Sequence, residues 1–144
     1  MKTRTFVYVG NLLMLIWLAL GVWVVLSSNV LMGALYIVVI FLSLVIVAYS
    51  LCAKCPCRFH SCAHIVLGRL TRLLPRRRPG RYTFGDKVGA TVYLVGLHAL
   101  PQYWLWQNKV LFALFWVLSI TVFLVLHFAA CPTCKNEYCS LKGT

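Results

Sequence analysis

The sequence predicts an all-α integral membrane protein, built as a bundle of four transmembrane helices in a single domain over residues 1–144. Of these residues 62% are hydrophobic and only 11% are charged, whereas about a quarter of a soluble domain is charged. The mean hydropathy of +0.87 is too high for a surface that faces water. Fourteen Lys and Arg residues are accompanied by only two acidic residues, so the mixed-charge surface of a small soluble protein is excluded.

The first two helices follow from a long uncharged stretch. Residues 5–53 contain no Asp, Glu, Lys or Arg, and a spanning helix needs about 20 apolar residues. The polar residues 27–29 are the only plausible break, which predicts helices near residues 6–26 and 30–51. Two basic residues before the first helix also fit a signal peptide. However, the apolar run exceeds the ~7–15 residues of a signal sequence, and we expect the helix to be retained.

Two further uncharged runs, over residues 88–108 and 110–134, predict a third helix near 88–105 and a fourth near 110–130. Because the turns within each half of the chain are very short, the four helices should form two helical hairpins. A helix satisfies its own backbone hydrogen bonds in lipid, which an open sheet cannot do. Gly89 and Gly96, seven residues apart, are expected to allow close helix packing in the third helix.

The distribution of basic residues predicts the orientation. Two precede the first helix, nine lie in the loop over residues 52–87, two follow the fourth helix, and only Lys109 lies on the other side. The positive-inside rule therefore places both termini, the 52–87 loop and the 131–144 tail in the cytoplasm.

The 52–87 loop contains an amphipathic segment and a basic run. Apolar residues recur at helical spacing over residues 64–74, which predicts an interfacial helix that ends at Pro75. The arginines that follow are expected either to contact anionic lipids or simply to hold the loop inside. No pattern of a nucleic-acid-binding module accompanies them, so nucleic acid is not expected as a partner. The lipid contacts are assigned to Arg76, Arg77 and Arg78.

All seven cysteines fall on the predicted cytoplasmic side, where the reducing environment favours metal binding or redox chemistry over structural disulfides. A CxxC pair follows the second helix and another follows the fourth. If these helices pack side by side, the two pairs offer four thiolates for zinc or an iron–sulfur cluster. Alternatively, the loop cysteines hold the metal alone or with two histidines. The candidate ligands are Cys52, Cys55, Cys57, Cys62, Cys131, Cys134, Cys139, His60 and His64.

Three other interpretations of the cysteines stay open. Thiols next to a helix end are typical palmitoylation sites. Cys131 and Cys134 could form a dithiol that cycles with a disulfide, as in a membrane thiol-disulfide oxidoreductase. The cysteines could also be small buried hydrophobes in a purely structural, lipid-interacting protein.

His98, Gln102 and His127 are the notable polar residues of the two C-terminal helices. Ionisable groups in membrane helices are candidate functional residues, and either histidine could contact a quinone or haem. Their predicted depths differ by roughly 9 Å at 1.5 Å per residue, which argues against one haem between them. We expect His98 to make a polar contact with Tyr, Ser or a backbone carbonyl instead.

These patterns together predict a small membrane subunit with a cysteine-ligated metal centre at its cytoplasmic end. An iron–sulfur cluster would transfer electrons, and zinc would clamp the helices together. Since no catalytic motif is present, a non-catalytic or electron-transfer role is favoured over that of an enzyme. The short outer turns predict that other membrane subunits or a cytoplasmic protein are the partners.

Overall fold

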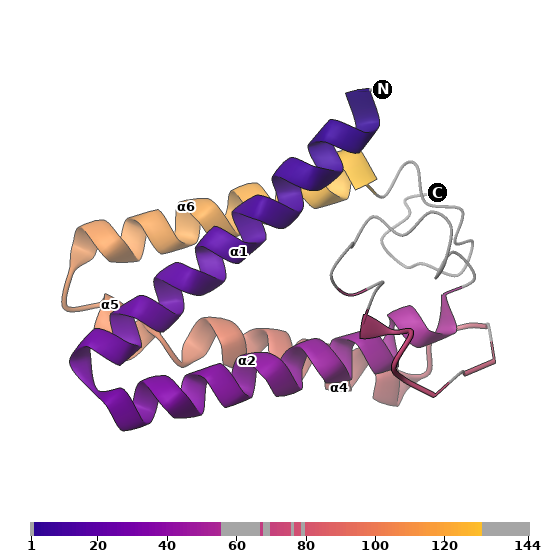
Figure 1. The fold of residues 1–144 in the computed structure, drawn as a ribbon, viewed down its shortest axis with the longest axis horizontal. Helices are drawn as coiled ribbons and strands as arrows, with labels where there is room; N and C mark the ends of the chain where they lie inside the picture. Colours follow the sequence, from indigo (N-terminus) through magenta and orange to yellow (C-terminus); the bar gives the residue numbers. More distant parts are fainter. Residues whose placement is uncertain (1, 56–66, 68–69, 76, 79, 131–144) are drawn as a thin grey trace.

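The computed structural model describes residues 2–55, 67, 70–75, 77–78 and 80–130, and within them it is helical, with no strand. The four-helix count of the prediction fits, since four of the helices are long: α1, α2, α4 and α6. In chain order the elements are α1 (Lys2–Ser28), α2 (Val30–Ser50), η1 (Cys52–Lys54), α4 (Phe84–Ala99), α5 (Gln102–Leu105), α6 (Lys109–Val125) and η2 (Leu126–Ala130) (Figure 1).

The predicted break between the first two helices is confirmed. A single residue, Asn29, separates α1 from α2, and its side-chain oxygen accepts a hydrogen bond from the Met32 backbone N–H at 3.1 Å. An Asn at this position satisfies one of the N–H groups that the first turn of a helix leaves unpaired. The local sequence therefore ends one helix and caps the next.

The prediction of one uninterrupted third helix over residues 88–105 is wrong. The helix begins earlier, at Phe84, and ends at Ala99, and the short α5 follows Pro101. Proline has no N–H and disrupts a helix interior. The fourth helix reaches Ala130 as expected, although its last turn, η2, is a π-helix.

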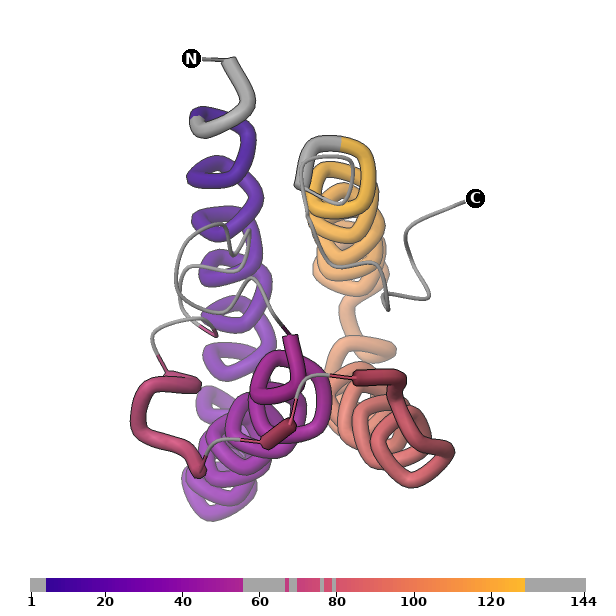
Figure 2. Tube along the Cα trace, turned by 90° about the vertical axis from the view of Figure 1, so that its right-hand side faces the viewer, coloured from indigo at the N-terminus to yellow at the C-terminus, as the bar shows by residue number. Residues whose placement is uncertain are grey.

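The helices are arranged in two pairs. α1 packs along α6, α2 packs along α4, and α1 also contacts α2. Figure 1 shows that the two pairs diverge toward the end that carries the N-terminus, and Figure 2 shows this end face on. Helices α2 and α6, which carry the CxxC motifs at their ends, therefore belong to different pairs.

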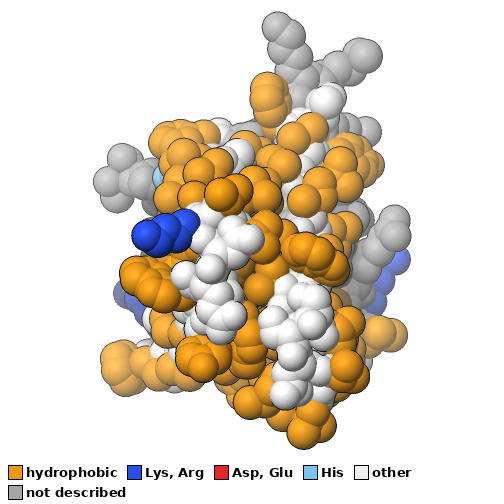
Figure 3. Space-filling model, turned by 90° about the vertical axis from the view of Figure 1, so that its left-hand side faces the viewer, with side chains coloured by type: hydrophobic (Ala, Val, Ile, Leu, Met, Phe, Trp, Pro, Cys, Tyr) orange, Lys and Arg blue, Asp and Glu red, His pale blue; other side chains and the backbone are white. Residues whose placement is uncertain are grey.

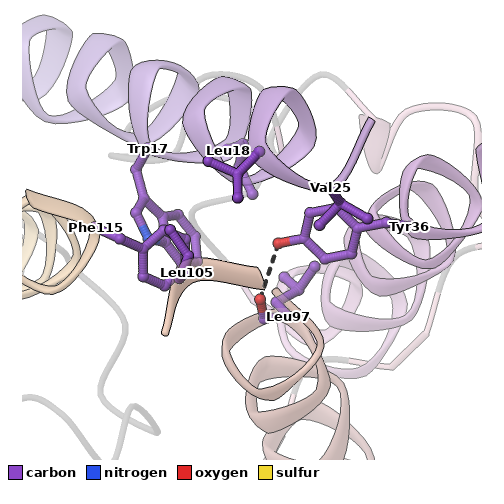
Figure 4. Packing of buried hydrophobic residues seen from close by; sticks show 8 residues of the cluster. Trp17, Leu18, Val25, Tyr36, Leu97, Leu105 and Phe115 are labelled. Carbon is purple, nitrogen blue, oxygen red and sulfur yellow. Dashed lines mark hydrogen bonds between the residues drawn. The ribbon is translucent and has the colours of Figure 1, made fainter. Parts of the chain in front are cut away.

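The buried core lies near the opposite end, where α1 meets α2 and α5 meets α6. Trp17, Tyr36, Leu97, Leu105 and Phe115 belong to one hydrophobic cluster (Figure 4). Around this core the surface is apolar, and Figure 3 shows hydrophobic side chains over most of the face at this end. Within the described residues, three helical segments are long and apolar enough to cross a membrane: Thr5–Ser28, Val30–Lys54 and Lys109–Phe128. The protein thus has the character of a membrane protein.

The interruption at Pro101 is compensated by side chains. Because Pro101 has no N–H, the Leu97 carbonyl loses its helical partner, and an unpaired carbonyl is costly in lipid. The Tyr36 hydroxyl of α2 donates to this carbonyl at 2.9 Å (Figure 4). The Gln102 side-chain N–H₂ donates to the His98 carbonyl at 2.7 Å. These two bonds explain how a broken helix is tolerated beside α2.

The close approaches expected at Gly89 and Gly96 occur at other glycines, and the approach to backbone occurs at Gly33. A methyl group added to Gly89 would lie 3.8 Å from the Ser50 hydroxyl, an ordinary contact, and one added to Gly96 would meet nothing within 4 Å. A methyl group on Gly33, by contrast, would lie 2.7 Å from the Cα of Leu26. The tight α1–α2 connection, and not the α4 face, requires a glycine.

Gly33→Ala should therefore lower the free energy of unfolding by about 1–2 kcal/mol, because the backbone of Leu26 must move. Gly96→Ala is the matched control, since an Ala in an uncrowded helix should be neutral or stabilising by up to about 1 kcal/mol. Unfolding of both variants in detergent, followed by circular dichroism, checks the difference. Equal losses in the two variants would refute the proposed close approach.

Candidate metal centre

The first CxxC motif forms a single helical turn where α2 ends. Cys52 begins the turn η1, and the Cys55 N–H donates to the Cys52 carbonyl at 3.1 Å. Residues three apart are eclipsed in a 3-10 turn, so the two cysteines lie on one side of it. Both side chains are half-buried. The turn thus holds the two cysteines of the motif together at the end of α2.

An ion cluster holds this turn against the start of α4. Lys54 stands between the two cysteines in the sequence, and its ammonium pairs with the buried Asp86 carboxylate. The Arg77 guanidinium donates to the other Asp86 oxygen at 2.7 Å and lies 4.9 Å from the Tyr49 ring centroid. Thr83 completes the site, since its N–H and hydroxyl donate to Asp86 at 2.9 and 2.7 Å. One carboxylate thus ties together the end of α2, the loop and α4.

The electrostatics of the cluster keep Asp86 ionised. Burial by itself would raise the pKa of the Asp86 carboxyl, but hydrogen bonds from Lys54, Thr83 and Arg77 outweigh it and hold this pKa well below its usual range. The position of Asp86 in the first turn of α4 also favours negative charge, because the helix dipole is positive there. Two cations face one anion, so the cluster keeps a net positive charge beside the thiols.

Since the pKa of Asp86 is lower in the folded than in the unfolded state, its contribution to stability is complete above about pH 5. The contribution should be lost as the pH falls below about 4, the ordinary pKa of an aspartate. Acid titration of the free energy of unfolding checks this, with Asp86→Asn as the comparison. The variant should show a much shallower fall between about pH 4 and pH 2. An equally steep fall in both proteins would contradict this assignment.

Most of the predicted metal ligands lie outside the described residues. Within the described part, Cys52 and Cys55 are placed together, and no group of three or more His, Cys, Asp or Glu side chains occurs there. α2 and α6, the long helices that precede the two CxxC motifs, pack in different pairs. The second motif lies outside the described residues, so a site shared by both motifs stays a prediction. The predicted ligands outside the described residues are Cys57, Cys62, Cys131, Cys134, Cys139, His60 and His64.

The three arginines that were predicted to contact lipid do not share one environment. The Arg77 guanidinium pairs with Asp86 and lies over the Tyr49 ring, and its side chain stays 26% exposed, so its predicted lipid contact stays a prediction. Arg78 is exposed, and Arg76 lies outside the described residues. The interfacial helix predicted over 64–74 is described only in part. There the Thr71 N–H donates to the Leu67 carbonyl at 3.0 Å, as in a helix.

His98 makes the polar contact that the sequence predicts. Its Nε2 lies 2.8 Å from the Ser119 hydroxyl of α6, and its Nδ1 lies 2.8 Å from the Leu94 carbonyl. Since a carbonyl only accepts, Nδ1 carries the proton and, in the neutral ring, Nε2 accepts from Ser119. The ring also packs between Trp17 and Trp116, at centroid distances of 4.8 and 5.7 Å. A haem or quinone ligand role would have to break one of these hydrogen bonds.

His127 occupies a different place, in the π-helical turn η2. Its ring stacks on Phe123 at 5.8 Å, and its buried Nδ1 has no hydrogen-bond partner among the described residues. His127 follows Ser119, the partner of His98, by eight residues, or about 12 Å along a helix. This separation agrees with the expectation that the two histidines do not hold one haem.

The Asp86 cluster and the Tyr36 hydroxyl bond are the site features that sequence reasoning missed. One signal was present, because Thr83 and Asp86 have the spacing of a capping box, which the structure contains. It marks the true start of α4, four residues before the predicted one. No comparable signal identifies Lys54 and Arg77 as the partners of this carboxylate.

Comparison of the chain with protein-family models, with characterised proteins and with solved structures finds no significant match.

Proposed function

We propose that this protein is a small polytopic membrane subunit that binds a metal through cysteines at its cytoplasmic end. The observation that carries the proposal is the CxxC turn of Cys52 and Cys55, held in place by the pairing of Lys54 with Asp86. A turn that is fixed before binding loses little conformational freedom when a metal arrives.

Two sets of residues can complete the ligand sphere. The local set is Cys57, Cys62, His60 and His64, which follow the turn directly in the chain. The distant set is the second CxxC pair, Cys131 and Cys134, which begins directly after the end of η2. Cys139 belongs to neither CxxC pair and is the least favoured of the candidate ligands. One observation supports the distant set: Figure 1 shows that α2 and η2 finish on the same side of the molecule. The helix pairs to which they belong diverge on that side. An iron–sulfur cluster would serve electron transfer, and zinc would clamp a larger complex.

The cytoplasmic orientation belongs to the same proposal. Lys54 ends η1, and both Lys54 and Arg77 pair with Asp86 in the first turn of α4, whereas Lys109 begins α6. Figure 1 shows that α2 ends and α4 begins at the end of the molecule where α1 begins, and that α6 begins at the other end. This asymmetry supports a cytoplasmic location for both termini through the positive-inside rule. Anionic lipids are proposed to contact Arg76 and Arg78 at this end, while Arg77 serves the Asp86 cluster.

Matched serine variants test the metal site. Cys52→Ser and Cys55→Ser should lose bound metal from the purified full-length protein and lower its melting temperature, because metal binding stabilises the folded state. Cys139→Ser is the control, and its bound metal and its melting temperature should both fall far less. Loss of metal in Cys131→Ser would assign the shared site, and retention would assign the loop site. Unchanged metal content in Cys52→Ser and Cys55→Ser would refute the proposal.

A further inference from the structure

The described loop residues and the start of α4 carry a surface of unusual composition. We call these residues the cap surface, and all of them are exposed. Two of them are the most exposed large hydrophobic side chains among the described residues, Leu73 at 84% and Phe84 at 83%. The other members are cations. The cap surface consists of Arg72, Leu73, Arg78, Arg81, Phe84 and Lys87.

The charge of this surface has one sign within the described part. Asp86 is the only acidic residue described, and it is 6% exposed and paired with Lys54 and Arg77. The single carboxylate is therefore turned inward and neutralised by cations that do not belong to the cap surface. The charged groups that remain exposed on the cap surface are all cations, which are complementary to an anionic partner.

The position of the surface favours lipid as that partner. Phe84 is the first residue of α4, and the ion cluster joins this point to the end of α2. The start of α4 therefore lies beside the end of the apolar segment Val30–Lys54, which in a membrane is the level of the lipid headgroups. Exposed aromatic and aliphatic side chains flanked by Arg and Lys are typical of segments that lie in this interface. An acidic protein would neutralise the cations but would leave no reason for Leu73 and Phe84 to project at the membrane surface.

We propose that the cap surface docks onto the headgroup layer of the surrounding leaflet and selects anionic lipid. Leu73 and Phe84 insert beside the acyl chains, and the four cations contact lipid phosphates. The inference rests on the membrane location in the proposed function but not on the metal site. It extends the lipid contact from the arginine run to a surface with its own apolar anchors.

The test uses the full-length protein in nanodiscs of phosphatidylcholine with and without phosphatidylglycerol. Lipids that stay bound after transfer to detergent are counted by native mass spectrometry. Phosphatidylglycerol should be retained in preference to phosphatidylcholine. Arg78→Gln and Arg81→Gln should each lower that preference roughly fivefold, the effect of one surface charge. Lys109→Gln, which neutralises the cation at the other end, is the matched control and should leave it unchanged.

A second measurement tests the apolar anchors. A photoreactive phenylalanine analogue at position 84 should cross-link to lipid in the nanodiscs, and the same analogue at position 73 should do so too. Equal retention of both lipids by the unsubstituted protein, or cross-links at 84 to an added protein and not to lipid, would overturn the inference. Neither readout depends on bound metal, so a failure here is distinct from a failure of the metal proposal.

Discussion

Asp86→Ala should destabilise the protein by about 3–5 kcal/mol, the cost of breaking a buried ion pair by removing one partner. The variant leaves the Lys54 ammonium without its anion in a site where the lysine side chain is only 10% exposed. It also removes the acceptor of the Arg77 and Thr83 hydrogen bonds. Denaturant unfolding in detergent, followed by circular dichroism, measures the loss.

Two variants test whether the loss of stability in Asp86→Ala comes from the broken ion pair and not from any substitution in this region. Lys87→Ala changes the exposed residue next to Asp86 in the chain and should alter the free energy of unfolding by less than about 0.5 kcal/mol. Replacing both members of the pair, as Lys54→Met with Asp86→Leu, should recover much of the stability, because an apolar pair avoids the unpaired buried charge. A loss below about 1 kcal/mol in Asp86→Ala would contradict the role assigned to the cluster.

Tyr36→Phe should lower the free energy of unfolding by about 1–3 kcal/mol, because it leaves the buried Leu97 carbonyl without a donor. Tyr36 is 3% exposed, so water cannot take the place of the hydroxyl. Tyr103→Phe is the matched control, since this tyrosine is 73% exposed and loses only a solvated hydroxyl. Its stability should be close to that of the unsubstituted protein.

Tyr36→Phe in a protein that also carries Pro101→Ala tests whether the Tyr36 hydroxyl compensates for the N–H that proline lacks. An alanine at 101 supplies the N–H that proline lacks, and this N–H can donate to Leu97 as in an ordinary helix. Tyr36→Phe should therefore cost clearly less in Pro101→Ala than in the unsubstituted protein, and a double-mutant cycle measures the difference. The same cost in both backgrounds would show that Tyr36 does not compensate for the proline.

The positions of α1, α2 and α6 were predictable because lipid imposes one dominant requirement, an apolar length of about 20 residues. The break at Asn29 was also predictable, since a polar residue that caps a helix shows in the local sequence. The interruption at Pro101 was not assigned, although the proline was visible. Whether a helix can break there depends on Tyr36, which lies far away in the chain and comes close only in the folded protein.

Of the candidate site, the sequence predicted only the pairing of two cysteines, and the metal itself stays a prediction. The spacing of Cys52 and Cys55 predicted a metal-binding turn, and the structure places both residues on one half-buried turn. The ion cluster could not be predicted, because Asp86 has fourteen basic residues as possible partners and only the fold selects two of them. The pairing of α1 with α6 and of α2 with α4 likewise depends on tertiary packing that helical periodicity does not encode.

Metal analysis of the purified full-length protein, together with its visible absorption spectrum, tests the central claim most directly. We expect a stoichiometric amount of metal that is released when Cys52 is replaced. Iron with visible charge-transfer bands would assign an electron-transfer subunit, and colourless protein with zinc would assign a structural clamp. A metal-free protein in which Cys131 and Cys134 cycle between dithiol and disulfide would contradict the claim.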